Sequence, residues 1–211
     1  MDHDDFAVEP VPGLPELPPE GERILWQGRP AWFRLTWESL SLPWVIGYFV
    51  FLAVWRFVAV VDLMPLGQAI GASVPFLILG AIVAFGLLLV GYVQARSTLY
   101  TVTNKRVAMR IGAALTVTLN LPYTQIANAA LSLRKGGTGT IALETADAMP
   151  LGYAMCWPHV RPWHILRPQP ALRCVPDAEH VAQIIAQSAE ARVNLPQVAR
   201  AGVPAQTVAA E

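Results

Sequence analysis

The residue types best suited to chemistry gather in one short run, Cys156-Trp157-Pro158-His159-Val160-Arg161-Pro162-Trp163. Alternate side chains of an extended chain face the same way, so the indoles, the imidazole and the guanidinium of this run can share one surface. Aromatic and arginine side chains are the usual anchors of protein interfaces. We therefore expect a protein-contact surface made of Trp157, His159, Arg161 and Trp163.

A structural role for the same run is the alternative. Pro158 and Pro162 stiffen the chain and donate no backbone hydrogen bond, so the run belongs at an edge or in a loop. In that case His159 is a hydrogen-bonded residue of a rigid corner, and it contacts no partner.

Basic residues form a second set of candidates. Lys105, Arg106 and Arg110 lie in and after the first predicted turn of the C-terminal half. Each base near an anionic bilayer contributes about 1 kcal/mol of attraction, so these residues can bind lipid headgroups. Ordinary positive charge on the cytoplasmic side of a membrane is the alternative.

Arg56 is the one charge within a long apolar run. It either extends its side chain to the nearby headgroups or pairs with a group on a partner's transmembrane helix.

Catalysis is not expected. The chain has no nucleotide-binding glycine loop, no zinc-protease motif and no nucleophile elbow. The carboxylates of its C-terminal half are too sparse for an acid–base pair. The chain carries 15 basic and 15 acidic residues, and this balance argues against nucleic acid as a partner. We therefore expect neither a metal nor a resident cofactor.

The elements that position these residues begin with two apolar runs. Residues 43–61 hold one charge and residues 70–93 hold none. A hydrocarbon core of about 30 Å takes roughly 20 helical residues, so both runs can span a bilayer. Residues 62–69 then form the short turn of an antiparallel hairpin. Only 14% of all residues are charged, against about 25% in a soluble domain.

The distribution of bases predicts the orientation of this hairpin. The turn holds no Lys or Arg, whereas bases flank both outer ends: Arg23, Arg29, Arg34, Arg96, Lys105, Arg106 and Arg110. By the positive-inside rule both flanks, and with them both termini, lie in the cytoplasm.

Composition divides the chain into five parts. We expect an acidic, proline-rich tail at residues 1–22, a juxtamembrane segment with a short interfacial helix at 23–41, the hairpin at 42–94, a β-rich domain at 97–192 and a flexible tail at 193–211.

The β-rich domain alternates with the period of strands. Strands are expected at 98–103, 106–111, 115–121, 125–133 and 140–144, with less regular ones at 151–156 and 171–175, before a helix from Asp177 to about residue 191. An antiparallel barrel of about seven strands, capped by one C-terminal helix, is the plan of a pleckstrin-homology-like (PH-like) domain. The fold class is thus a transmembrane helical hairpin plus an α+β PH-like domain.

Several segments carry a family resemblance. Residues 22–30 and 99–107 resemble the bacterial PH-domain membrane proteins. The Trp-Pro-His-Val-Arg-Pro-Trp run, residues 170–178 and residues 9–15 are similar to the photosynthetic complex assembly proteins of purple bacteria, the PuhB family. The resemblance covers about residues 6–190.

This resemblance implies a non-enzymatic assembly factor in the bacterial inner membrane. Its partners would be subunits of the photosynthetic reaction centre and the core light-harvesting antenna, and self-association as a homodimer is expected. One alternative is an envelope protein that binds membrane lipid headgroups. Another is a bacteriochlorophyll-handover factor, in which His159 transiently ligates the pigment magnesium.

Overall fold

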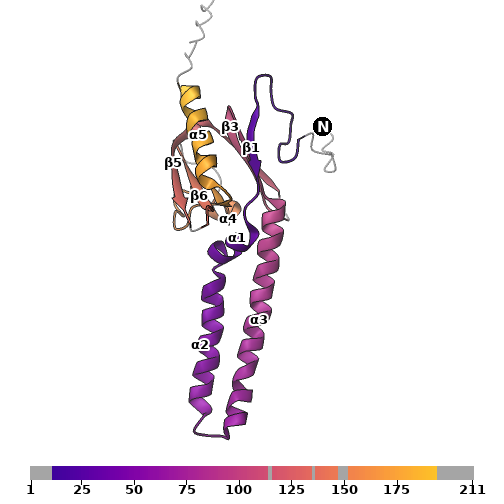
Figure 1. Ribbon diagram of the computed structural model, residues 1–211, viewed down its shortest axis with the longest axis vertical. Coiled ribbons are helices and arrows are strands. Elements are labelled where there is room, and N and C mark those ends of the chain that lie inside the picture. Colours follow the sequence, from indigo (N-terminus) through magenta and orange to yellow (C-terminus); the bar gives the residue numbers. More distant parts are fainter. Residues whose placement is uncertain (1–10, 114–115, 135, 147–151, 194–211) are drawn as a thin grey trace, which may run out of the picture.

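The structure is a computed structural model that describes residues 11–113, 116–134, 136–146 and 152–193. A β-rich domain stands at one end of a long helical hairpin (Figure 1). Most of the two expected tails, residues 1–10 and 194–211, lies outside the described residues.

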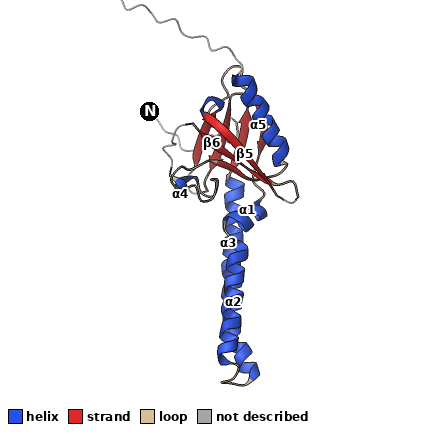
Figure 2. Ribbon diagram, turned by 90° about the vertical axis from the view of Figure 1, so that its left-hand side faces the viewer, coloured by secondary structure: helices blue, strands red, loops and turns tan. Residues whose placement is uncertain are grey.

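Three helices occupy the first half of the chain: α1 (Trp32–Ser39), α2 (Leu42–Val60) and α3 (Leu66–Ser97). Of the described helices, α2 and α3 are long and apolar enough to cross a membrane. They coincide with the two expected spans, and α1 is the expected short helix. Figure 2 shows the hairpin projecting from the domain as a separate arm.

The two long helices pack closely at small residues. A Cβ added to Gly80 of α3 would lie only 2.7 Å from the Phe49 Cβ of α2. The outward side of the arm instead exposes large apolar side chains, among them Trp44, Trp55 and Phe85. An exposed apolar surface of this extent marks contact with lipid or with another protein.

The strands form two antiparallel sheets. The first has the order β1-β2-β3-β4, with β1 Ile24–Gly28, β2 Leu99–Thr103, β3 Arg106–Ile111 and β4 Val117–Pro122. The second has the order β5-β6-β7, with β5 Ile126–Leu133, β6 Gly139–Thr145 and β7 Ala171–Val175. The remaining elements are the 3₁₀ turn η1 (Tyr123–Gln125), the short helix α4 (Tyr153–Cys156) and the C-terminal helix α5 (Ala178–Val193).

This arrangement is consistent with a PH-like domain, but the described strands form two sheets rather than one closed barrel. The two sheets separate at Pro122, which ends β4 and has no backbone N–H to donate a hydrogen bond to a neighbouring strand. The η1 turn that follows redirects the chain, and β5 begins the second sheet.

Two segments differ from the sequence-based expectation. Residues 24–28, expected to belong to the juxtamembrane segment outside the β-rich domain, form an edge strand in which Gly28 pairs with Tyr100 of β2. Residues 153–156, expected to be part of a strand, form α4, in which the Met155 and Cys156 amides donate to the Gly152 carbonyl. The first sheet is therefore completed by chain that precedes the hairpin.

One hydrophobic core fills the space between the two sheets and α5. Helix α5 lies across the open side of the sheets in both views (Figures 1 and 2). Val181 and Ile185 of α5 pack there against buried side chains of both sheets, including Val107, Leu121, Ile141, Leu143 and Leu172. This packing confirms the predicted capping helix.

Helix α1 joins the arm to the domain. Leu35 of α1, Ala95 of α3 and Cys174 of β7 form a small buried cluster. The Ala31 amide, just before α1, donates to the Cys174 carbonyl at 2.9 Å. Contacts on both sides of α1 therefore hold the hairpin and the domain together as one unit.

Candidate functional site

His159 lies in the interior, where α3 passes into β2. Its Nε2 is 2.9 Å from the Thr98 Oγ1, and its Nδ1 is 2.6 Å from the Tyr100 hydroxyl. The Thr98 hydroxyl donates to the Gln94 carbonyl at 2.8 Å, and the Tyr100 oxygen accepts the Arg173 backbone N–H at 3.2 Å. These contacts, the His159 network, tie the loop that carries His159 to the end of the hairpin and to both sheets.

The network assigns the tautomer of His159. The hydroxyl of Thr98 donates its single proton to the Gln94 carbonyl, so Thr98 Oγ1 accepts the hydrogen bond that His159 Nε2–H donates. Tyr100 already accepts from Arg173, and its own proton goes to Nδ1. His159 is therefore the neutral Nε2–H form.

Burial keeps this imidazole neutral. Its side chain is fully buried. Loss of hydration, and secondarily the nearby Arg173 guanidinium, lower the pKa of His159 to about 3. A proton added at Nδ1 would also point at the hydroxyl proton that Tyr100 donates to this nitrogen. The side chain thus acts as a fixed structural hydrogen-bonding group across the physiological pH range.

The expectation of a shared contact surface is therefore wrong for His159. The surroundings of His159 are those of the structural alternative, because the prolines and the network turn the imidazole inward. Both ring nitrogens are occupied, so His159 offers no lone pair to a pigment magnesium in this structure. In the described part of the chain, no group of three or more His, Cys, Asp or Glu side chains could hold a metal ion.

The chain after His159 forms a loop that is closed at its base. The Ala171 amide donates to the His159 carbonyl at 3.0 Å, and the Arg161 amide donates to the Gln169 carbonyl at 2.9 Å. Between these contacts the loop exposes three large apolar side chains, which we call the apolar tip: Trp163 (90% exposed), Ile165 (64%) and Leu166 (98%).

Trp163 also has an unusual backbone. Its φ is +68°, a conformation that is a genuine outlier for a bulky residue. Strained residues of this kind cluster at functional sites. An exposed indole held on such a backbone is consistent with a contact residue, as expected from the sequence.

Trp157 and Trp163 lie beside the start of the hairpin. With Trp37 of α1 and Trp44 of α2 they line an open hollow of about 440 Å³. A second hollow of about 230 Å³ adjoins it against β5 and β6. The two hollows share four lining residues, which are Glu38, Arg134, Pro162 and Arg173. We call the two hollows together the junction groove.

The junction groove is basic. Three arginines line it, Arg134, Arg161 and Arg173, against one carboxylate, Glu38. The Arg134 Nε lies 3.5 Å from Glu38 Oε2, and Arg161 Nη1 donates to the Gln169 side chain at 3.0 Å. Arg161 is thus held at the rim by a neutral partner, and its charge is not cancelled there.

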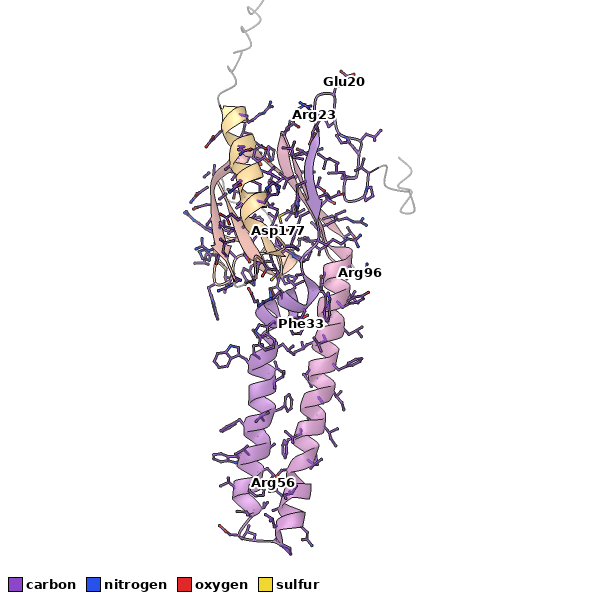
Figure 3. The ribbon with its side chains drawn as sticks, in the orientation of Figure 1. Glu20, Arg23, Phe33, Arg56, Arg96 and Asp177 are labelled. Carbon is purple, nitrogen blue, oxygen red and sulfur yellow. The ribbon has the colours of Figure 1, made fainter. Side chains whose placement is uncertain are left out.

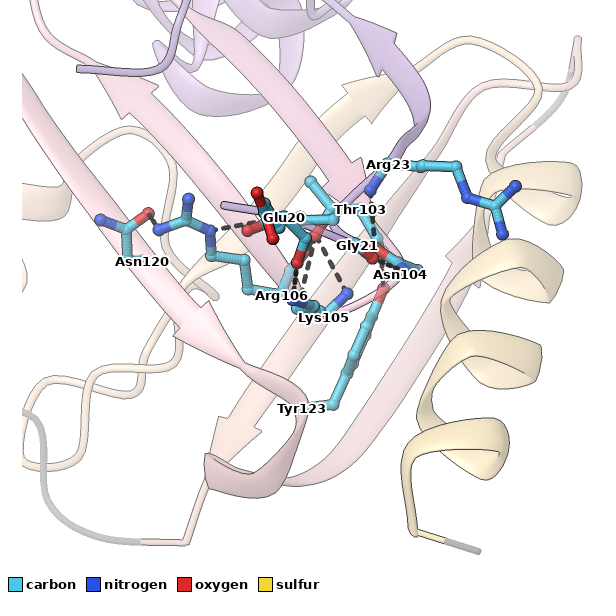
Figure 4. A network of polar contacts seen from close by, with 10 residues as sticks. Glu20, Gly21, Arg23, Thr103, Asn104, Lys105, Arg106, Asn120 and Tyr123 are labelled. Atoms are coloured by element: carbon cyan, nitrogen blue, oxygen red, sulfur yellow. Dashed lines mark hydrogen bonds and ion pairs between the residues drawn. The ribbon is translucent and has the colours of Figure 1, made fainter. Parts of the chain in front are cut away.

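Lys105 and Arg106 have a different setting. Lys105 Nζ donates to the Glu20 carbonyl at 2.9 Å, and Arg106 Nε lies 2.9 Å from Glu22 Oε1 (Figure 4). The Glu22 side chain is only 2% exposed. These bases therefore fasten the segment before β1 onto the turn between β2 and β3.

That turn also lies at the wrong end of the molecule for a headgroup site. Glu20 and Arg23 lie at the end of the domain opposite the hairpin, whereas Phe33 lies at the junction (Figure 3). The Asn104 amide donates to the Arg23 carbonyl at 3.1 Å, which places the turn beside Arg23. The expected Lys105–Arg106 headgroup surface next to the hairpin is thus not what the fold builds.

The other two basic candidates are placed separately. Arg110 is half-buried on β3. Arg56 is exposed on α2, toward the turn of the hairpin (Figure 3). The structure does not bring Arg56 together with Trp157 and Trp163, so the two contact regions expected from the sequence lie at opposite ends of the hairpin.

Sequence reasoning missed Arg173 and two residues of the apolar tip, Ile165 and Leu166. Arg173 occupies a β-strand of otherwise apolar residues, Ala171-Leu172-Arg173-Cys174-Val175, in which all five side chains are buried. A charge in such a strand was the available signal. Ile165 and Leu166 follow the motif directly, but two apolar residues in a loop give no sequence signal by themselves.

Comparisons with known proteins agree with this architecture. The sequence model of the bacterial PH domain matches residues 41–189. The match covers well over half of the chain, so this protein belongs to the bacterial PH domain family. The matched region starts just ahead of α2, so the hairpin is part of the shared unit together with β2 to β7 and most of α5, whereas β1 and α1 precede it.

One curated relative is similar over nearly the whole length. The chain is 44% identical over 203 residues, 95% of each chain, to a protein of Rhodobacter capsulatus named "Uncharacterized 23.7 kDa protein in puhA 5'region". A comparison with solved structures finds no match. The resemblance inferred from the sequence motifs is thereby confirmed at the level of the family.

Proposed function

We propose that this protein is a non-enzymatic assembly factor for the photosynthetic reaction centre and its core light-harvesting complex. The observation that carries the proposal is the apolar tip. Trp163, Ile165 and Leu166 are largely exposed on a loop whose base is closed by backbone hydrogen bonds. Exposed apolar clusters rimmed by polar groups mark interaction sites.

The position of the tip suits a membrane protein as the partner. Trp163 lines the junction groove together with Trp44, at the start of α2. If α2 and α3 span the bilayer, the tip lies next to the membrane surface, where the ends of another protein's transmembrane helices emerge. Reaction-centre and antenna subunits are built of such helices, and a scaffold that holds them needs a contact surface at this level.

The hairpin determines the topology that we propose. Both of its outer ends join the domain, because β1 before it pairs with β2 after it. Both described ends of the chain are therefore on one side, and the positive-inside rule makes that side the cytoplasm of the bacterial inner membrane. The homodimer remains an expectation from the resemblance.

The photosynthetic context rests on the relative. Its printed name assigns its gene to the 5' region of puhA, in agreement with the motifs that resemble photosynthetic assembly proteins. The two rival functions have less support, because Lys105 and Arg106 are engaged far from the hairpin and His159 is enclosed.

Crosslinking in native membranes tests this proposal. A photoreactive amino acid at Leu166 should crosslink to reaction-centre or core-antenna subunits while these complexes are being assembled. The control carries the same group at Leu17, which is also exposed (67%) but precedes β1, and it should give no such product.

A deletion strain supplies the second part of the test. A phototrophic bacterium lacking this gene should accumulate less reaction centre, and a variant with Trp163, Ile165 and Leu166 replaced by Ser should fail to restore it. Normal reaction-centre levels in the deletion strain would rule out the assembly role.

A further inference from the structure

Arg173 is a buried cation without a carboxylate partner among the described residues. It is 6% exposed. Its Nη1 donates to the Val160 carbonyl at 3.1 Å, while its Nε is buried and has no hydrogen-bond partner. A guanidinium has five N–H donors, and the buried Nε–H of Arg173 is one that has no acceptor within the described chain.

Such a group is costly unless an anion compensates it. Burying an unpaired charge carries a penalty of several kcal/mol, and the pKa of arginine is too high for the group to escape by losing its proton. Glu38 lines the same groove, but it forms an ion pair with Arg134. An acceptor from outside the chain would complete the hydrogen bonds of Arg173.

We propose that the junction groove binds the phosphate of an anionic phospholipid. Arg173 provides a buried positive charge, and Arg134 and Arg161 line the same groove and add to that charge. Planar guanidinium groups match the oxygens of a phosphate with paired hydrogen bonds. Three arginines against Glu38 leave a surplus of two positive charges for an anion.

The walls of the groove fit a lipid better than a free ion. Trp37, Trp44, Trp157 and Trp163 line the larger hollow, and tryptophan is enriched at the level of lipid headgroups. Ser41 and Pro43, at the very start of α2, line it as well. The volume of about 440 Å³ is within the range of ordinary ligand pockets.

The position of the groove relative to the hairpin indicates that the bound lipid belongs to the surrounding bilayer. The groove opens where α1 meets α2, so a phosphate in it can stay attached to acyl chains that run beside α2. This step rests on the part of the proposed function that places α2 and α3 across the membrane. It does not depend on any role in assembly.

Lipid retention by the purified full-length protein tests the inference. The protein is placed in nanodiscs of equal parts phosphatidylglycerol and phosphatidylcholine, re-extracted in detergent, and its bound lipids are counted by native mass spectrometry. The wild type should retain phosphatidylglycerol selectively. Arg134→Gln together with Arg161→Gln should weaken retention at least about tenfold, the usual effect of losing charge-assisted hydrogen bonds.

Two further variants separate this groove from other basic surfaces. Lys105→Gln with Arg192→Gln removes the same charge at the opposite end of the domain and should leave retention unchanged. Arg173→Lys keeps the charge but loses the planar fork, and it should weaken retention in protein that remains folded by circular dichroism.

Three results would overturn the inference. They are equal retention of both lipids, an equal loss in the Lys105 and Arg192 control, and displacement of the lipid by millimolar inorganic phosphate. The last result would make the groove a site for a soluble anion. All three are measured without any partner protein, so they leave the assembly proposal to its own crosslinking test.

Discussion

At the scale of single residues, the most informative change concerns His159. Its neighbours in the sequence predict an exposed contact surface. In the structure its imidazole instead forms hydrogen bonds with Thr98, at the end of α3, and with Tyr100 of β2. Trp157 and Trp163, two and four residues away, face outward. The motif therefore combines a buried hydrogen-bonding residue, His159, with two exposed tryptophans.

The His159 network makes stability depend on pH. The pKa of His159 is about 3 in the folded chain and near 6.5 when unfolded, so below pH 6.5 the unfolded chain binds the proton first. The contribution of neutral His159 to the free energy of unfolding is complete above pH 6.5. It declines as the pH falls toward 3, by up to about 1.4 kcal/mol per pH unit.

Thermal unfolding in detergent at about pH 7.5 and about pH 5 measures this dependence. His159→Gln should lower stability at the higher pH, because a buried partner is lost, and should depend less on pH than the wild type. His180→Gln, on the exposed side of α5, is the control. An unchanged pH dependence in His159→Gln would contradict the assignment.

At the scale of elements, α1 decides how the domain sits on the hairpin. It packs on α3 at Gly91, where the backbone of α3 directly meets the Thr36 side chain. It also lies against β7, because the amide before it bonds to Cys174. The junction groove exists because α1 holds these two surfaces at a constant spacing.

Gly91→Ala should therefore disturb the junction. An added Cβ would collide with Thr36 Oγ1, and overpacking of this kind costs about 1–3 kcal/mol. Gly86→Ala is a matched control in the same helix, since a Cβ there meets nothing within 4 Å. Unfolding in detergent should show a lower midpoint for Gly91→Ala only.

The same comparison has a functional readout. If the groove binds lipid as proposed, Gly91→Ala should also weaken retention of phosphatidylglycerol while Gly86→Ala does not. Equal midpoints for the two variants would show that α1 can shift without cost, against the close packing seen here.

At the scale of the whole molecule, the notable feature is that one domain is assembled across a hairpin. β1 lies before the arm and β2 lies after it. They pair at four positions, from Ile24 with Thr103 to Gly28 with Tyr100, with a register shift between Ile24 and Trp26. The sheet thus closes only if both ends of the hairpin return to the same side.

Labelling in intact cells tests this topology. Both native cysteines, Cys156 and Cys174, are buried, and burial raises the pKa of each thiol, so background labelling should be low. Leu63→Cys, in the exposed turn of the hairpin, should react with a membrane-impermeant maleimide added from the periplasmic side. Glu179→Cys on α5 should react only after the membrane is opened.

The opposite outcome would be equally clear. Labelling of both positions from outside, or of Glu179→Cys alone, would contradict the placement of the domain in the cytoplasm.

Much of this architecture follows from the sequence because it depends on local patterns. The helices α2 and α3 were predicted from long apolar runs with Arg56 as the one charge, and β2 to β6 and α5 were predicted from periodicity. These signals lie within each segment, since a helix closes its own hydrogen bonds and alternation shows which side of a strand is buried. The assignment to the bacterial PH domain family follows from motifs of the same kind.

Only the tertiary structure decided what happens between segments. β1 became a strand because an edge of β2, distant in the chain, offered it hydrogen bonds, and His159 turned inward because Thr98 and Tyr100 stand opposite its two nitrogens. Arg134, Arg161 and Arg173 line one groove for the same reason. Proximity between distant residues arises from packing, and a local pattern of residue types does not encode it.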